Sequence, residues 1–346
     1  MMNLKALVRP NIWNLVPYSS ARSEFTGTAS VFLDANENPL NSPYNRYPDP
    51  LQHEVKSLIA GLRGVPAGQI FLGVGSDECI DVVYRTFCRP GVDNVVAMAP
   101  SYGMYEVCAD INDVAYRRVP LTDGFGLDTE AMLAAADGHT KVMWICSPNN
   151  PTGNAFDLDE ITALCRRFEG IVVVDEAYID FSSRGSMLSR LGSLPNLIVM
   201  QTLSKAWGSA AVRLGIAFAS QEIIDIFNKV KYPYNINLLT QQYAVLRLKR
   251  HGEVQEWVDM LLAGRKALTE ALATLKCVVK IFPSDANFVL VRVTDADAIY
   301  DYLRSRGIIV RNRNRVEKCL GCLRITVGTA EETESLINAL KDYGKE

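Results

Sequence analysis

The sequence predicts an α/β fold in which a large domain, built on a mostly parallel central sheet with flanking helices, is joined to a smaller α+β domain. Strand-like apolar runs alternate with helical patterns from about Ile70 to Ser220, which is typical of the crossover units of a parallel sheet. The pattern then becomes helical and ends in a shorter mixture of strands and helices. A chain of 346 residues also exceeds the size at which one hydrophobic core usually stops growing, so we expect two domains.

Five apolar runs are the predicted strands of the large sheet: residues 94–99, 141–146, 171–174, 197–201 and 214–219. The run at 171–174, with the sequence Ile-Val-Val-Val, is continuously apolar and β-branched, as expected for a strand that is covered on both faces. We therefore predict that this strand lies in the middle of the sheet.

The C-terminal part of the chain has a different pattern. A long amphipathic stretch at 253–276 predicts a helix that could bridge two domains. Beyond it, strands are predicted at 287–293, 308–311 and 322–327, and helices at 295–306 and 330–343. These patterns predict three parts: an N-terminal segment, 1–40, that packs with the small domain, a large domain, 41–250, and the small domain, 251–346.

Charge and composition exclude several classes of function. The net charge of -3, from 36 basic and 39 acidic residues, gives no general attraction to nucleic acid or to anionic lipid. Lys5 and Arg9 interrupt any apolar core of a signal peptide, and no apolar stretch is long enough to span a membrane, so we expect a cytoplasmic protein. The eight cysteines are expected to be reduced, and the Cys319 and Cys322 pair lacks further zinc ligands, so no metal is expected.

Unusual residues gather where the predicted strands end, which is where ligands bind in open α/β sheets. A glycine turn at 73–75 leads into a helical pattern, and the amides around Gly75, Ser76 and Asp77 could hold a phosphate at the helix start. Ser76 could equally cap that helix. The segment 147–153 contains Asn150 between two prolines and reads either as a ligand-binding loop or as a tight turn.

Two charged residues complete the pattern at the strand ends. Asp175 directly follows the buried run at 171–174, and a carboxylate at that depth needs a partner. Lys205 lies on a turn between two predicted strands, where burial and neighbouring cations can lower the pKa of its amine and make it a nucleophile. An ordinary surface lysine is the alternative reading.

In their order and spacing these elements resemble fold-type I pyridoxal-phosphate aminotransferases over nearly the whole chain. The matching motifs are N-N-P-T-G at 149–153, V-V-D-E-A-Y at 173–178 and T-L-S-K at 202–205. The resemblance implies that Lys205 carries the cofactor covalently, that Asp175 bonds the pyridine nitrogen, and that Tyr178, with Asn150, contacts the phenolic oxygen of the ring. It further implies cofactor contacts from Gly75, Ser76, Asp77, Tyr102, Asn150, Thr202, Ser204 and Arg213.

Further motifs look like those of histidinol-phosphate aminotransferases: P-Y-S-S-A-R at 17–22, L-D-A-N-E-N-P at 33–39, R-Y-P-D-P at 46–50 and C-L-R-I-T-V-G at 322–328. This resemblance implies transfer of the amino group of L-histidinol phosphate to 2-oxoglutarate, which gives imidazole-acetol phosphate and L-glutamate in histidine biosynthesis. It also implies that Tyr47 reaches the cofactor phosphate of a partner subunit, and therefore a homodimer. One departure is that Gly-Ser-Ala-Ala at 208–211 leaves no glycine directly before Val212 and Arg213.

The same resemblance implies four substrate-binding residues: Tyr18, Asn36, Arg311 and Arg324. A planar guanidinium can pair with the phosphate of one substrate and the carboxylate of the other. For each arginine alone, a surface ion pair is the alternative.

Other functions of the same fold stay open. A phospho-threonine decarboxylase also takes a phosphorylated amine, and aromatic aminotransferases share the ring-binding residues. A non-catalytic effector sensor is disfavoured because Lys205 is intact and no helix-turn-helix extension precedes Tyr18.

Overall fold

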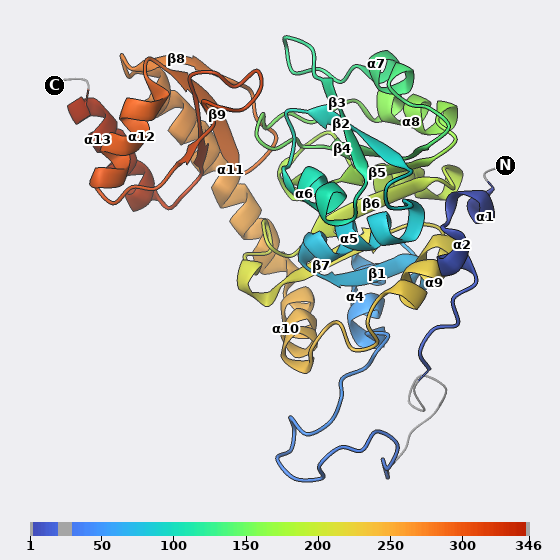
Figure 1. Cartoon of the computed structure of the whole chain (residues 1–346). Coiled ribbons are helices and arrows are strands. Elements are labelled where there is room, and N and C mark those ends of the chain that lie inside the picture. The colour runs from blue at the N-terminus through green and yellow to red at the C-terminus, as the bar shows by residue number, and fades with distance from the viewer. Residues whose placement is uncertain (1–2, 20–29, 344–346) are drawn as a thin grey trace.

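The structure, a computed structural model, describes residues 3–19 and 30–343. A large body built on a central sheet is connected by one long helix to a smaller body (Figure 1). The central sheet has seven strands in the order β1-β7-β6-β5-β4-β2-β3. Their bounds are β1 Ile70–Val74, β2 Asn94–Ala99, β3 Ala115–Pro120, β4 Thr140–Cys146, β5 Ile171–Asp175, β6 Leu197–Thr202 and β7 Leu214–Phe218.

Most strands of the central sheet run in one direction. The pairs β2–β3, β2–β4, β4–β5 and β5–β6 are parallel, whereas β7 is antiparallel to both of its neighbours, β1 and β6. The predicted mostly parallel sheet is therefore confirmed. The strand β5 has three strands on either side and is buried along its whole length, so its predicted central place is confirmed too.

Some strands were not singled out by their sequence. β3, A-Y-R-R-V-P, forms one edge of the sheet and is half-exposed, and its two arginines interrupt the apolar run that marks an inner strand. β1, I-F-L-G-V, is buried but ends in the glycines that also signal a turn. The sequence therefore identified covered strands better than those at the edges.

Helices cover both faces of the central sheet, because alternate side chains of its strands enter two hydrophobic clusters. In β5, Ile171 and Val173 join one cluster, and Val172 and Val174 join the other. The first cluster is covered by α5 Gly75–Phe87, α6 Met104–Ile111 and α9 Gln221–Val230. The second is covered by α4 His53–Arg63, α7 Thr129–Ala134, α8 Leu158–Arg167 and α10 Leu238–Lys249.

The N-terminal helices α1 (Leu4–Leu7) and α2 (Pro10–Trp13) pack on the large body, with α2 lying beside α9 (Figure 1). The Arg9 amide donates to the Thr86 carbonyl at 3.0 Å, and Val8 is buried in the cluster under α5 and α9. The expected packing of residues 1–40 with the small domain is therefore wrong for these helices, because their apolar side chains complete the core of the large body. Residues 20–22 of the 17–22 motif lie outside the described residues.

The small body contains a four-stranded antiparallel sheet in the order β10-β11-β9-β8. Its elements are β8 Val278–Ile281, β9 Phe288–Val293, α12 Ala296–Ser305, β10 Arg311–Asn312, β11 Cys322–Thr326 and α13 Ala330–Tyr343. The strand predicted at 308–311 is wrong over 308–310. The Ile308 amide donates to the Leu303 carbonyl at 2.9 Å and closes the end of α12, so it cannot join the sheet.

The helix α11 (His251–Ala273) joins the two bodies, as the amphipathic stretch predicts. Val254 and Val258 in its first half are buried in a cluster of the large body, whereas Leu268 and Leu272 in its second half are buried in the core of the small sheet. We propose that the small domain begins at this helix, at residue 251. No helix in the described ranges combines the length and the apolarity that crossing a membrane requires.

Candidate active site

The predicted cofactor residues meet at one edge of the central sheet. β1, β2, β4, β5 and β6 all end there, because they run in the same direction. β7 runs in the opposite direction, so Arg213, which directly precedes it, lies at that edge as well. The topology thereby brings together Gly75, Ser76, Asp77, Tyr102, Asn150, Asp175, Tyr178, Thr202, Ser204, Lys205 and Arg213.

Asp175 is the last residue of the central strand β5 and is only 3% exposed. One carboxylate oxygen accepts a hydrogen bond from the Tyr105 hydroxyl at 2.7 Å, and the other accepts one from the Ala177 amide at 3.0 Å. Burial raises the pKa of this carboxyl, although both hydrogen bonds act against the rise. Within the described residues no cationic side chain is hydrogen-bonded to Asp175, so a bound group with a positive N–H would suit it.

Lys205 extends from the turn after β6, and its ammonium nitrogen lies 5.5 Å from the centre of the Tyr178 ring. Desolvation lowers the pKa of this amine, and the charge of Arg324 lowers it further. The side chain is still open to solvent, so water weakens both effects. The direction of the shift favours the neutral amine that a nucleophile or a base requires.

The start of α5 and Arg213 form a candidate phosphate socket. The Gly75 amide donates to the Arg213 carbonyl at 2.8 Å and so cannot serve a ligand, whereas the amides of Ser76 and Asp77 have no acceptor within the helix. Thr202 and Ser204 add two hydroxyls that lie 3.0 Å apart. Val74 occupies the cap position and Ser76 lies inside the first turn, so Ser76 does not cap the helix.

Close backbone contacts hold this socket together. Gly75 has a φ of 70°, in the left-handed region that favours glycine, and a Cβ there would lie 2.5 Å from the Arg213 guanidinium, which would have to move. Arg213 itself adopts a left-handed conformation with φ of 56°, which is uncommon for a residue other than glycine. The segment 208–211, which departs from the family's sequence, leads directly into this strained Arg213. The Arg213 guanidinium donates to the Asp77 carboxylate at 3.1 Å.

Tyr102 lies beside the same carboxylate. Its hydroxyl donates to Asp77 at 3.2 Å, and its ring meets the Tyr105 ring edge-on at 5.6 Å. Burial raises the pKa of the Tyr102 hydroxyl, so it stays protonated at neutral pH and remains a donor. Tyr102 thus borders the space between Asp77 and Asp175.

The small sheet contributes two of the predicted substrate residues. Arg324 on β11 donates to the side-chain oxygen of Asn150 at 2.5 Å, so the small sheet meets the loop after β4. Arg311 on β10 is the direct cross-strand partner of Arg324. Like charges directly opposite each other destabilise a sheet, and no carboxylate of the described residues forms an ion pair with either arginine. This pair is therefore suited to an anionic ligand.

Three other predicted residues are not brought to this edge within one chain. Tyr18 is 74% exposed on the segment that follows α2. Asn36 and Tyr47 border a cavity of about 590 Å³ on the segment that extends away from the body (Figure 1). The Tyr47 ring stacks on Tyr234 at 4.4 Å.

Sequence reasoning missed Tyr105, which contacts Asp175 directly. It lies three residues after Tyr102 in the same P-S-Y-G-M-Y segment, at the buried start of α6. A signal was present, because a tyrosine on the buried face of a short helix needs an acceptor for its hydroxyl. The segment alone did not show which acceptor it meets.

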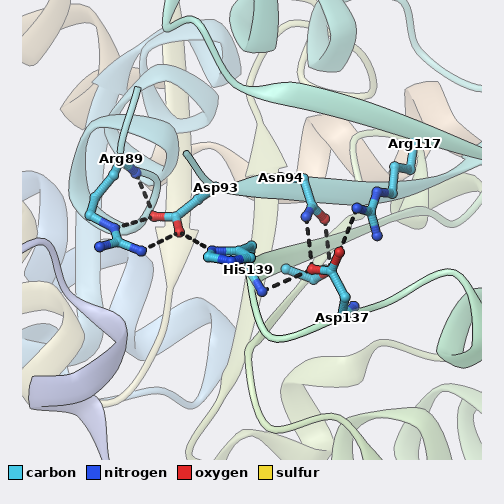
Figure 2. A network of polar contacts seen from close by, with 7 residues as sticks. Arg89, Asp93, Asn94, Arg117, Asp137 and His139 are labelled. Atoms are coloured by element: carbon cyan, nitrogen blue, oxygen red, sulfur yellow. Dashed lines mark hydrogen bonds and ion pairs between the residues drawn. The ribbon is translucent and has the colours of Figure 1, made fainter. Parts of the chain in front are cut away.

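The opposite edge of the sheet also carries charged residues, but their contacts are satisfied internally (Figure 2). The buried Asp93 accepts two hydrogen bonds from the Arg89 side chain, at 2.9 and 3.0 Å. Asp137 accepts hydrogen bonds from Arg117 at 2.5 Å and from Asn94 at 3.0 Å. These pairs hold the starts of the strands in place, whereas Arg311 and Arg324 form no ion pair with a carboxylate of the described residues.

Comparison with known proteins identifies the family. Residues 22–340 match the family described as Aminotransferase class I and II. The chain is 57% identical to the histidinol-phosphate aminotransferase of Parabacteroides distasonis over 342 residues, which cover 99% of each chain. The chain belongs to the histidinol-phosphate aminotransferases, within aminotransferase class I and II. A further member, from Cytophaga hutchinsonii, is 50% identical over 99% of each chain. Membership of this family makes the chain a transaminase, as its sequence predicts.

Solved structures confirm the predicted fold class. The histidinol-phosphate aminotransferase of Clostridium acetobutylicum superposes with a TM-score of 0.80 at 22% identity, over 87% of this chain and 91% of that one. The enzyme of Sinorhizobium meliloti, solved in complex with pyridoxal-5'-phosphate, gives the same TM-score at 24% identity, over 87% and 83%. L-threonine-O-3-phosphate decarboxylase of Porphyromonas gingivalis gives 0.74 at 19% identity, over 88% and 92%. At these identities the likeness shows the fold alone.

Proposed function

We propose that this chain transfers the amino group of L-histidinol phosphate to 2-oxoglutarate, giving imidazole-acetol phosphate and L-glutamate in histidine biosynthesis. The observation that carries the proposal is the cross-strand pair of Arg311 and Arg324, whose charges no described carboxylate neutralises and of which Arg324 lies near Lys205. The pair is separate from the phosphate socket at α5, so a substrate with an anionic group of its own is expected there. The high identity to histidinol-phosphate aminotransferases over the full chain supports the same choice.

The residues at the carboxyl ends of the central strands fit pyridoxal phosphate. Two helix-start amides, two hydroxyls and the Arg213 guanidinium match the acceptor oxygens and the charge of its phosphate group. The Asp175 carboxylate would keep a proton on the ring nitrogen. The protonated nitrogen is a cation, and a buried carboxylate such as Asp175 is stabilised by a cationic partner. Asn150 and Tyr178 would contact the phenolic oxygen, and Tyr102 would stack on the ring. When bound, the cofactor serves as an electron sink and carries the amino group between the two half-reactions.

Lys205 would supply both the attachment point and the base. Its lowered pKa raises the fraction of neutral amine, which can take a proton from the amino-bearing carbon of the donor and, in the second half-reaction, supply one to the corresponding carbon of the acceptor. The Tyr178 ring 5.5 Å away limits where that nitrogen can move. Asp175 keeps its proton-holding role because Tyr105 and the Ala177 amide fix both of its oxygens.

Both substrates would use the same arginines in alternate half-reactions. L-histidinol phosphate has no carboxylate, so its phosphate must provide most of the charge recognition. 2-Oxoglutarate is a dicarboxylate and can pair with the same guanidiniums. Asn36 and Tyr18 would join the substrate site from the N-terminal segment.

We further propose a homodimer whose two active sites are shared. The segment before α4 leaves apolar side chains open to water in one chain, with Leu33 92% and Leu40 71% exposed. Its end is fixed to the large body, because the Lys231 ammonium donates to the Pro50 carbonyl at 2.8 Å. A second chain that covered these side chains would place Tyr47 at the cofactor phosphate of its partner.

The test is a substrate comparison with the unaltered holoenzyme. We expect kcat/KM for L-histidinol phosphate to exceed that for unphosphorylated L-histidinol by about 30-fold to 1000-fold, because a desolvated, charge-assisted phosphate contact contributes roughly 2 to 4 kcal/mol. Phenylalanine as amino donor is the control for a general aromatic aminotransferase. Equal efficiency on the two histidinols would refute the proposal, and release of carbon dioxide from a phosphorylated amino acid would indicate a decarboxylase instead.

A further inference from the structure

The segment at 311–315 alternates arginine and asparagine, R-N-R-N-R. Asn312 and Asn314 both donate to the Asp297 carboxylate at the start of α12, at 2.6 and 2.8 Å. Arg313 continues the pairing with β11, because its amide donates to the Cys322 carbonyl at 2.9 Å. Successive side chains of an extended segment point to opposite faces, so the side chains of Arg311 and Arg313 point away from Asp297, toward the opposite face.

That side of the small sheet faces the large body. Phe288 and Leu290 of β9 are buried in a cluster with side chains of the large body, whereas Val289 and Val291 are buried under α12 and α13. In the antiparallel register Leu290 lies opposite Arg324, so Arg324 shares the side that meets the large body. Figure 1 shows α12 and α13 on the far side of the small sheet.

Arg313 lies close enough to Arg324 and Arg311 to feel their charges, and no described carboxylate forms an ion pair with it. It is half-buried and no side-chain hydrogen bond joins it to a described residue, and its Nε atom, like that of Arg324, is buried and unpaired. Burial lowers the pKa of Arg313 to about 10, and the charges of Arg324 and Arg311 contribute to the shift. The guanidinium is still charged at neutral pH. Arg313 and Arg324 are both half-buried, and a charge that is taken out of water without an anionic partner is costly. An anion bound between them and the exposed Arg311 would offset this cost.

We propose that Arg313 is a third substrate-binding arginine, which holds the phosphate group of the amino donor together with Arg311 and Arg324. This inference rests on the proposed function. A phosphate monoester presents three acceptor oxygens and nearly two negative charges at one end, which can serve several guanidiniums at once. Each carboxylate of glutamate carries one charge and two oxygens, which one guanidinium satisfies in a bidentate pair. Arg313 therefore selects the phosphorylated substrate over the dicarboxylate.

The experiment compares three amino donors in the holoenzyme: L-histidinol phosphate, L-histidinol and L-glutamate in the reverse direction. Arg313→Gln should lower kcat/KM for L-histidinol phosphate by about 30-fold to 1000-fold, mainly through KM, and change the values for the other two less than about 5-fold. Arg313→Lys, which keeps the charge but not the planar fork, should recover part of the loss. Arg315→Gln is the matched control, because Arg315 is exposed on the same segment and should leave all three values unchanged.

Each outcome decides between the proposals. If the unaltered enzyme does not prefer L-histidinol phosphate to L-histidinol, the proposed function itself fails. If the preference is present but Arg313→Gln keeps it, or lowers all donors equally, the assignment of Arg313 is overturned while the proposed function stands. If neither Arg313 variant folds, as judged by circular dichroism, Arg313 is a structural residue and the assignment is overturned as well.

Discussion

At the scale of single residues, the chemistry of this site is set by charges that lack their usual partners. Asp175 is buried with two hydrogen-bond donors but without a cation bonded to it, and Lys205 is held beside Arg324. Neither arrangement stabilises the chain, because burial of the carboxylate and repulsion between the cations both cost free energy. Such perturbed groups at one sheet edge are typical of catalytic sites.

Asp175→Asn should abolish most activity with little effect on stability. The neutral amide keeps the size of the side chain but no longer favours a proton on the ring nitrogen, so we expect kcat to fall by about 100-fold or more. The thermal midpoint should change by only a few degrees, because the carboxylate is itself disfavoured by burial. Steady-state kinetics and differential scanning calorimetry measure the two effects.

The matched control is Tyr105→Phe, which removes one hydrogen bond to the same carboxylate but leaves its charge. It should retain far more activity than Asp175→Asn. Near-normal turnover by Asp175→Asn would reassign the carboxylate as structural.

At the scale of elements, buried polar side chains fasten the strand ends to the loops that follow them. Glu176, directly after β5, accepts hydrogen bonds from the Ser186 hydroxyl at 2.5 Å, the Met187 amide at 2.7 Å and the Gln201 side chain at 3.0 Å. These contacts join β5, β6 and the 3-10 helix Met187–Ser193. They hold the backbone from which Asp175 and Tyr178 extend.

The Glu176 network should make stability depend on pH. Burial raises the pKa of Glu176 to about 7 from an ordinary value of 4.5, so the folded protein binds a proton more tightly than the unfolded chain does between these values. Stability should therefore fall as pH rises from 4.5 through 7, by roughly 2 to 4 kcal/mol for this group. Glu176→Gln removes the titration, so the thermal midpoint of the variant should rise relative to that of the unaltered protein as pH rises from about 4.5 to about 7.

Glu130→Gln is the control for this measurement. Glu130 lies on the surface with Arg167, and that contact lowers the pKa of Glu130, so the group does not titrate in the same window. A midpoint difference for Glu176→Gln that stays constant across the window would show that Glu176 titrates outside it.

At the scale of the whole molecule, one chain brings together Lys205, Asp175, Arg311 and Arg324. Tyr47 lies apart from them, at the cavity that Asn36 also borders. The small body meets the active edge through the contact between Arg324 and Asn150, and α11 carries it there. The segment around Tyr47 is anchored at Pro50 and extends outward. A dimer would bring this segment to a second active edge.

Mixing two variants that are each altered at one site residue tests that arrangement. Subunit exchange between Tyr47→Phe and Lys205→Ala proteins should give heterodimers in which one site carries both changes and the other carries neither. The mixture should therefore be more active than either parent, in proportion to the heterodimer measured by native mass spectrometry. Exchange without any gain would place Tyr47 outside the partner's site.

Several features follow from the sequence by itself. The apolar β-branched run at 171–174 predicts the central strand because burial on both faces requires it, and the residues that follow each strand predict the cofactor site. These signals are local, since each lies within one element and the turn after it. The resemblance to aminotransferases depends on the same local motifs.

Other features were decided only by the tertiary structure. The contact between Tyr105 and Asp175 joins residues 70 positions apart, and the pairing of Arg311 with Arg324 depends on the register of β10 and β11. The strand predicted at 308–310 does not form, because the Ile308 amide donates to the Leu303 carbonyl at the end of α12 and is not free to bond a neighbouring strand. Such contacts depend on which elements become neighbours, and the free energy that selects them comes from packing the whole core rather than from any one segment.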